Sequence, residues 1–153
     1  MFKKFLKIFL IAIFCVISFT TEAIVVDKRP VTVGISYFSE NEIAKAMING
    51  AKKATKKYNG QLYLRNGRGE TDVQIAQIHD LIAQGTNCLV IICEDENNNR
   101  FVENAEKANV PVVVLKKENQ NKETAFNAAY QAVEEVIKKY KAKPVESAFY
   151  SGY

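Results

Sequence analysis

The stretch that decides the fold runs from Thr71 to Glu118 and reads TDVQIAQIHDLIAQG (71–85), TNCLVIIC (86–93), EDENNNRFVENAEKAN (94–109) and VPVVVLKKE (110–118). Apolar residues recur at helical spacing in the first and third segments, which predicts two helices. The second and fourth segments are short and rich in β-branched residues, which is typical of strands buried in a parallel sheet. This helix–strand–helix–strand order predicts an α/β fold.

The same alternation extends to both sides of that stretch. It predicts strands at 31–36, 61–66, 88–93 and 112–115, and helices at 42–58, 71–84, 98–109 and 122–140. Thr71 and Gln74 have the spacing of a capping box at the start of the second helix. We expect one open parallel sheet of four to five strands with helices on both faces. The segment Val145–Tyr150 is interpreted either as the fifth strand or as a tail resting on the sheet.

The N-terminus has the pattern of a secretory signal peptide. Lys3, Lys4 and Lys7 precede an apolar run, Ile8–Phe19, and small residues near Ala23 suit cleavage. We therefore expect a signal peptide at 1–23, a single domain at 24–153, and a periplasmic or extracellular protein. The apolar run is shorter than the roughly 20 residues of a spanning helix, and an uncleaved anchor is the alternative.

Composition excludes several classes of function. The chain has 153 residues and a net charge of +4, without the basic stripe that nucleic-acid binding needs. Cys88 and Cys93 lie five residues apart in one expected strand, roughly 16 Å at about 3.3 Å per residue, which is too far for a disulfide between them. We interpret both as buried small apolar residues. No metal or other cofactor is expected, and no catalytic set is recognisable, so we predict that the chain is not an enzyme.

Ligands of open parallel sheets bind beyond the carboxyl ends of the strands. The loop at 37–42 follows the first strand, and its aromatic and polar side chains suit a sugar ring and its hydroxyls: Tyr37, Phe38, Glu40 and Asn41. The alternative is that the two aromatics pack under helices and that Glu40 and Asn41 cap one.

Three other loops reach the same predicted edge. Glu94, Asp95 and Glu96 follow the third strand and either bind a ligand or stabilise a helix start. Gly67-Arg68-Gly69 lacks the remaining residues of a phosphate loop and is better explained as a turn. Lys116 comes at the end of the fourth strand. It is either a ligand contact or part of an exposed charged cluster. The single histidine, His79, lies within a helix and is expected to be structural or exposed.

At these residues the chain resembles the type I periplasmic sugar-binding proteins of ABC transporters, of the ribose, galactose and xylose type. The resemblance rests on VTVGIS (31–36), NGA (49–51), QIAQIHDLIAQGTNCLVIIC (74–93) and AEKANVPVVVLKKE (105–118). It covers Val31 to Glu118, which corresponds to the first of the family's two lobes. It implies that a sugar would contact this lobe at Glu40, Asn41, Glu96 and Lys116.

The resemblance implies an exported carbohydrate-binding protein, reduced to one lobe, whose sugar binding is either retained or vestigial. Its expected partners are a small sugar and an ABC transporter permease, with membrane association only through that transporter. The alternative is an interaction module that contacts a transporter, a sensor or a second copy of itself. One lobe offers a ligand one wall, so residues 122–153 are expected to act as a replacement lid or to cover the sheet edge.

Overall fold

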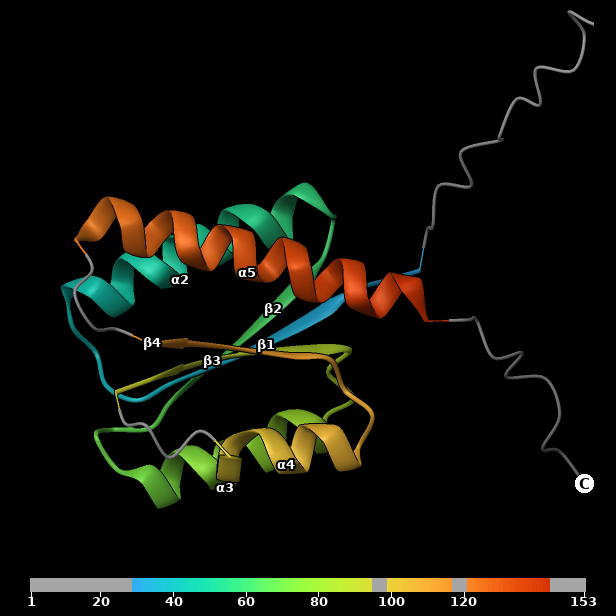
Figure 1. Cartoon of the computed structure of the whole chain (residues 1–153), viewed down its shortest axis with the longest axis horizontal. Coiled ribbons are helices and arrows are strands. Elements are labelled where there is room, and N and C mark those ends of the chain that lie inside the picture. The colour runs from blue at the N-terminus through green and yellow to red at the C-terminus, as the bar shows by residue number, and fades with distance from the viewer. Residues whose placement is uncertain (1–28, 95–98, 117–120, 144–153) are drawn as a thin grey trace, which may run out of the picture.

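The computed structural model describes residues 29–94, 99–116 and 121–143, in which four strands form one parallel sheet (Figure 1). The strands stand in the order β2-β1-β3-β4. Their bounds are Thr32–Tyr37 for β1, Gln61–Asn66 for β2, Cys88–Cys93 for β3 and Val112–Lys116 for β4. The predicted α/β fold with an open parallel sheet is confirmed. The segment predicted as a fifth strand lies outside the described residues.

Helices cover both faces of the sheet, as predicted. In the described ranges, α2 (Glu42–Lys57) and α5 (Lys122–Ala142) lie side by side on one face. The other face carries α3 (Thr71–Ala83) and α4 (Asn99–Lys107), as Figure 1 shows. None of the helices in this described part is long and apolar enough to cross a bilayer.

The topology puts a change of direction between the two central strands. The chain runs from β1 through α2 to the outer strand β2, and then through α3 back across the sheet to β3. The loop after β1 therefore leads to one face, whereas the loop after β3 leads to the other. A crevice outside the carboxyl ends of β1 and β3 is where ligands of such sheets bind.

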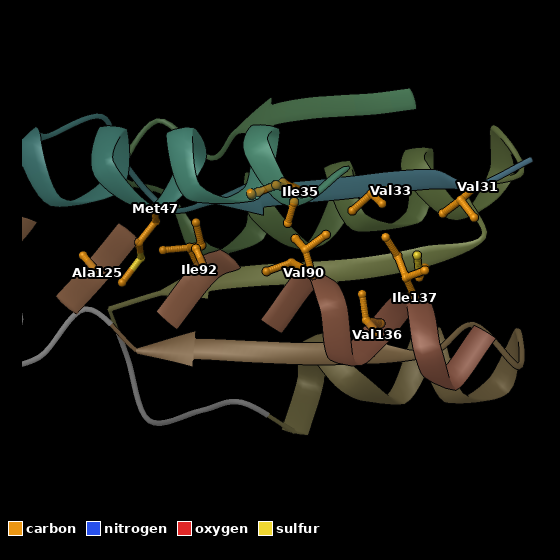
Figure 2. Packing of buried hydrophobic residues seen from close by; sticks show 14 residues of the cluster. Val31, Val33, Ile35, Met47, Val90, Ile92, Ala125, Val136 and Ile137 are labelled. Carbon is orange, nitrogen blue, oxygen red and sulfur yellow. The ribbon is translucent and has the colours of Figure 1, made fainter. Parts of the chain in front are cut away.

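Two apolar layers hold the sheet between its helices. All six residues of β3 are buried, which explains why its sequence is apolar without alternation. Figure 2 shows one layer, in which valines and isoleucines of β1 and β3 meet Met47 of α2 and Ile137 of α5. The second layer packs Leu89 and Ile91 against Phe101 of α4. Cys88 and Cys93 are buried free thiols within these layers, as predicted.

The helices α2 and α5 approach each other closely at Gly50. A Cβ atom built on Gly50 would lie 2.1 Å from the carbonyl oxygen of Phe126 in α5. Non-bonded heavy atoms cannot come that close, so the crossing requires a residue without a side chain. The adjacent small residues Ala51, Ala129 and Ala54 are all fully buried in the same layer.

Helix α5 is part of the core and not a lid. Six of its residues are buried against the sheet and α2, among them Val136 and Ile137 (Figure 2). The prediction that residues from Lys122 onward form a lid is therefore wrong for α5. Arg29 contacts the C-terminal end of α5. Its guanidinium donates to the carbonyl oxygens of Lys141 (2.6 Å) and Lys143 (3.3 Å). The same guanidinium lies 5.0 Å above the centre of the Tyr140 ring.

Several predicted boundaries shift by one or two residues. The strand expected at 31–36 runs from Thr32 to Tyr37, so Tyr37 belongs to β1 and not to the following loop. Lys116 likewise belongs to β4. Helix α4 ends at Lys107, two residues before the predicted end at residue 109, and Ala108 is exposed because it lies in the turn that follows.

Candidate functional site

Main-chain hydrogen bonds join the loops at the carboxyl edge of the sheet. The Phe38 N–H donates to the carbonyl oxygen of Ile92 at 3.0 Å, which ties the loop after β1 to the end of β3. Gly67 donates to the carbonyl oxygen of Tyr37 at 2.7 Å and Gly69 to that of Phe38 at 2.8 Å. The residues that leave β1, β2 and β3 therefore form one connected surface. The loops after β1 and β2 share this edge, as predicted, whereas the loops predicted after β3 and β4 are described only at Glu94 and Lys116.

The two predicted aromatic residues are half-buried. Tyr37 packs against the apolar layer beneath α2, as the alternative interpretation predicted. Burial raises the pKa of its phenol, the nearby Glu40 raises it further, and a hydrogen bond with Asn66 lowers it. Phe38 is the first residue beyond the strand. Its partial exposure leaves part of the ring at the edge.

Asn41 and Glu40 already have local partners. The Asn41 side-chain oxygen accepts from the Ala44 N–H at 2.9 Å and so caps α2. The Glu40 carboxylate lies 3.4 Å from the Lys45 ammonium, and both side chains are more than half exposed. An exposed pair of this kind contributes little to stability and is easily exchanged for another partner. The structure therefore agrees with the capping interpretation of Asn41 and leaves Glu40 at the surface.

A hydroxyl–carboxylate pair joins the loops after β1 and β3. The Ser39 hydroxyl donates to Glu94 Oε1 at 3.2 Å, and Glu94 is exposed. No sequence pattern marks Ser39 as a site residue, although it stands between predicted contacts in the same loop. Glu96, the acid predicted to contact a sugar, lies outside the described residues.

Lys116 lies at the same edge, on the outer strand. It is the exposed last residue of β4 and is in register with Cys93, one residue before Glu94. The Tyr37–Ile92 register places the end of β1 at nearly the same level. Of the six predicted contact residues, the structure therefore brings Tyr37, Phe38, Glu40, Asn41 and Lys116 to one edge of the sheet.

Ion pairing also joins the two helices that start at this edge. Lys122 Nζ lies 2.8 Å from a carboxylate oxygen of Glu42, which connects the first turns of α5 and α2. The hydrogen bond and charge of Lys122, with a smaller effect of Lys45, lower the pKa of the Glu42 carboxyl. The edge therefore presents charges of both signs.

The capping box predicted from Thr71 and Gln74 is wrong. Helix α3 starts without a side-chain cap, and Glu70 occupies the N-cap position. Gln74 instead is fully buried, and its amide nitrogen donates to the carbonyl oxygen of Ile92 at 3.1 Å. The local sequence pattern favours a cap, but the position faces the sheet in the folded chain. Gln74 therefore connects α3 to the end of β3, a role that its local sequence pattern does not indicate.

The glycine loop after β2 is a turn, as predicted. Arg68 and Gly69 both have positive φ angles, of 57° and 80°. The Asn66 side-chain oxygen accepts from the Arg68 N–H at 2.9 Å, and Glu70 donates to the Gly67 carbonyl oxygen at 3.0 Å. These hydrogen bonds are internal to the turn, which accounts for the composition of the loop without a ligand.

Other features that could bind a metal or a ligand lie away from the edge formed by the loops after β1, β2 and β3. Within the described ranges, no three His, Cys, Asp or Glu side chains gather as metal ligands. His79 is exposed on α3, with its Nε2 atom 2.9 Å from the side-chain nitrogen of Asn104 in α4. Two surface hollows of about 330 and 400 Å³ lie where β2 and β4 begin, beside Gly60 and Pro111. Both are at the sheet edge opposite the predicted ligand loops.

Comparisons with solved structures show the same fold in sugar-transporter proteins. A galactofuranose-binding protein is 25% identical, over 60% of this chain and 32% of its own, with a TM-score of 0.51. A solute-binding protein from Bacillus halodurans C-125 with bound myo-inositol is 16% identical, over 57% and 31%, with a TM-score of 0.51. The arabinose ABC transporter binding component from Shewanella sp. ANA-3 is 22% identical, over 60% and 32%, with a TM-score of 0.50.

This chain spans about a third of the length of those solved structures, which fits a single lobe. No curated protein sequence matches it. A family model for the periplasmic binding protein domain matches residues 33–135, from the start of β1 into α5. The family is one of binding proteins and not of enzymes. That match covers more than half of the sequence, and the chain therefore belongs to the periplasmic binding protein domain family, as its resemblance to the type I sugar-binding proteins predicted.

Proposed function

We propose that the chain is an exported carbohydrate-binding protein related to the substrate-binding component of a sugar ABC transporter. The observation that carries this proposal is the junction of the loops after β1 and β3, where Ser39 and Glu94 meet outside the central strands. Family membership supports it, as do solved relatives with bound myo-inositol and arabinofuranose.

The chemistry of this edge suits a polyhydroxylated ligand. The carboxylates of Glu40 and Glu94 are exposed acceptors for sugar hydroxyls, and the Ser39 hydroxyl both donates and accepts. The exposed part of the Phe38 ring offers an apolar surface to the C–H face of a sugar. Glu96 and Lys116 complete the proposed set of contacts, together with Asn41 and Tyr37.

The site is one wall of a pocket, which sets the expected affinity. Ligand pockets usually bury about 70–90% of a small ligand's surface, and a single sheet edge covers much less. We therefore expect weak binding by the isolated chain, and tighter binding where a second chain supplies the opposite wall. An ABC transporter permease or a second copy of this chain is the proposed partner.

Export is part of the same proposal. Residues 1–23 act as the signal peptide and residues 24–153 form the exported single lobe, located in the periplasm or outside the cell. Mass spectrometry of the exported protein tests this, because cleavage after Ala23 gives a chain that begins at Ile24. A mature protein that still contains Lys3 and the apolar run would contradict it.

Titration with a panel of pentoses, hexoses and inositols, followed by calorimetry and by the melting temperature, tests sugar binding. We expect one sugar to stabilise the protein saturably. Glu40→Gln should weaken that response because it removes a charged acceptor. Asn41→Ser should also weaken it while preserving the cap of α2, since serine is as good an N-cap as asparagine. Lys52→Gln, on the exposed side of α2, is the matched control. An unchanged affinity in both site variants would contradict the site.

A second candidate function is an interaction module that contacts a transporter, a sensor or another copy of the chain. The observation that favours it is the engagement of Asn41 and Glu40 by Ala44 and Lys45, since both predicted sugar contacts have partners within the chain. A flat response to every sugar, together with a dimer in light scattering, would favour this module over the carbohydrate receptor.

A further inference from the structure

We infer that Gln74 is a positioning residue for the proposed carbohydrate edge. Through the end of β3 it holds the loop that carries Phe38, Ser39 and Glu40. The inference rests on the proposed function for its consequence, whereas its structural part can be measured without any sugar.

Gln74 occupies a core position on α3. It is fully buried, on the same helix face as the apolar residues Ile78 and Leu81. A buried primary amide costs free energy unless its polar atoms are paired, and a leucine or methionine would fill the same space without that cost. The hydrogen bond from Gln74 to the Ile92 carbonyl oxygen, 3.1 Å long, partly offsets this cost.

The Ile92 carbonyl oxygen is the meeting point of three elements. It accepts from the Gln74 amide of α3 and from the Phe38 N–H of the loop after β1, at 3.1 and 3.0 Å. Phe38 in turn accepts from Gly69 of the loop after β2 at 2.8 Å. The hydrogen bond from Gln74 therefore positions the carbonyl oxygen that also accepts the Phe38 N–H of the first ligand loop. Ser39, the next residue, reaches across to Glu94.

Close packing around Gln74 requires Gly67. A Cβ atom on Gly67 would lie 3.0 Å from the Gln74 Cβ and 3.0 Å from the Phe38 carbonyl oxygen. The side chain of Gln74 and the main chain of the ligand loop thus both lie close to Gly67. A residue larger than glycine would require the Gln74 side chain or the loop to shift by a few tenths of an ångström.

The hydrogen bond to Ile92 fixes the orientation of the Gln74 amide and leaves its oxygen unpaired within the described part of the chain. Only the amide nitrogen can donate to a carbonyl oxygen, so the side-chain oxygen must point away from Ile92. That oxygen is buried without a partner among the described residues. Removing the amide therefore removes an unsatisfied acceptor as well as a hydrogen bond. Global stability should change little, while the loop should loosen.

Hydrogen exchange followed by NMR on the purified protein tests the inference. In Gln74→Met, which keeps the length of the side chain, we expect the Phe38 amide to exchange about five to ten times faster, because one supporting hydrogen bond is lost. Amides within β3 should keep their rates. Gln77→Met is the matched control, because Gln77 donates from the same helix to the Asn66 carbonyl oxygen and not to Ile92. An unchanged Phe38 rate in Gln74→Met, or an equal increase in both variants, would overturn the inference.

Gly67→Ala approaches the same junction from the other side and covers the case in which Gln74→Met does not fold. It should also raise the exchange rate of the Phe38 amide, and an unchanged rate would count against the inference. A sugar titration separates this result from the proposed function. If the unmodified protein binds a sugar, Gln74→Met should weaken binding at an unchanged melting temperature, and equal affinity would refute the positioning role. If no sugar binds, the proposed function fails, and the exchange rates alone decide the role of Gln74.

Discussion

Replacing Gly50 with alanine should separate α2 from α5. The new Cβ would lie 2.1 Å from the Phe126 carbonyl oxygen, so the helices must move apart by about 1 Å or more to restore ordinary contact, which is at least about 3.0 Å. Overpacking of this kind costs about 1–3 kcal/mol, and a rigid main-chain obstacle favours the upper end. Alanine recovers about 1 kcal/mol through its higher helix propensity. We therefore expect a net loss of about 2 kcal/mol in the free energy of unfolding.

Urea unfolding followed by circular dichroism measures this loss, with Asn49→Ala as the control. Asn49 is the exposed neighbour of Gly50 in α2, so its replacement reports helix propensity without the close contact. It should stabilise the protein by about 0.5 kcal/mol. If Gly50→Ala were as stabilising as Asn49→Ala, the close crossing of α2 and α5 would be refuted.

Three further predictions concern other parts of the chain. Arg29→Ala should lower the free energy of unfolding by about 1–2 kcal/mol in urea unfolding, because two hydrogen bonds to the end of α5 are lost; Arg29→Lys should recover little, and full stability in both variants would contradict the contact. Burial raises the pKa of Cys88 to about 12, so Cys88 and Cys93 should resist a thiol reagent at pH 8 until the protein unfolds, and rapid labelling of the folded protein would contradict their burial. Lys122 lowers the pKa of Glu42, so this carboxylate stabilises the fold above its unfolded pKa near 4.5, and that contribution is lost as the pH falls through its lower folded pKa. As the pH is lowered from 6 to 3, the melting temperature should fall less steeply in Glu42→Gln than in the unmodified protein. An identical slope in both proteins would contradict the effect of Lys122.

The strands that are buried on both faces could be predicted from the sequence. The stretch Cys88–Cys93 has no alternation, ends at polar residues and follows a glycine turn, so its bounds were predicted without error. The bounds of β2 were also correct. In these segments local propensity and burial favour the same structure. The order of the elements then fixed the class of fold, and with it the edge at which the loops meet.

The details of the site depended on contacts that local patterns do not encode. Gln74 has the spacing of a capping residue, but the tertiary fold turns it toward the sheet, where it bonds Ile92. The predicted first strand ends at Ser36 and leaves Tyr37 in the following loop, whereas one further pair with Ile92 keeps Tyr37 in β1. Ser39 meets Glu94 across 55 positions of sequence, and no single-sequence pattern connects them.

The placement of α5 on the same face as α2 restricts what can pair with the outer edge of β4. Parallel crossovers are right-handed in about 98% of cases. On this face, a right-handed connection carries the chain toward β2, as the path from β1 through α2 does. A strand that followed α5 and joined β4 from outside would complete a left-handed crossover. The outer edge of β4, which pairs with no other strand among the described residues, is therefore better suited to a strand that does not follow α5 directly, such as one from another protein.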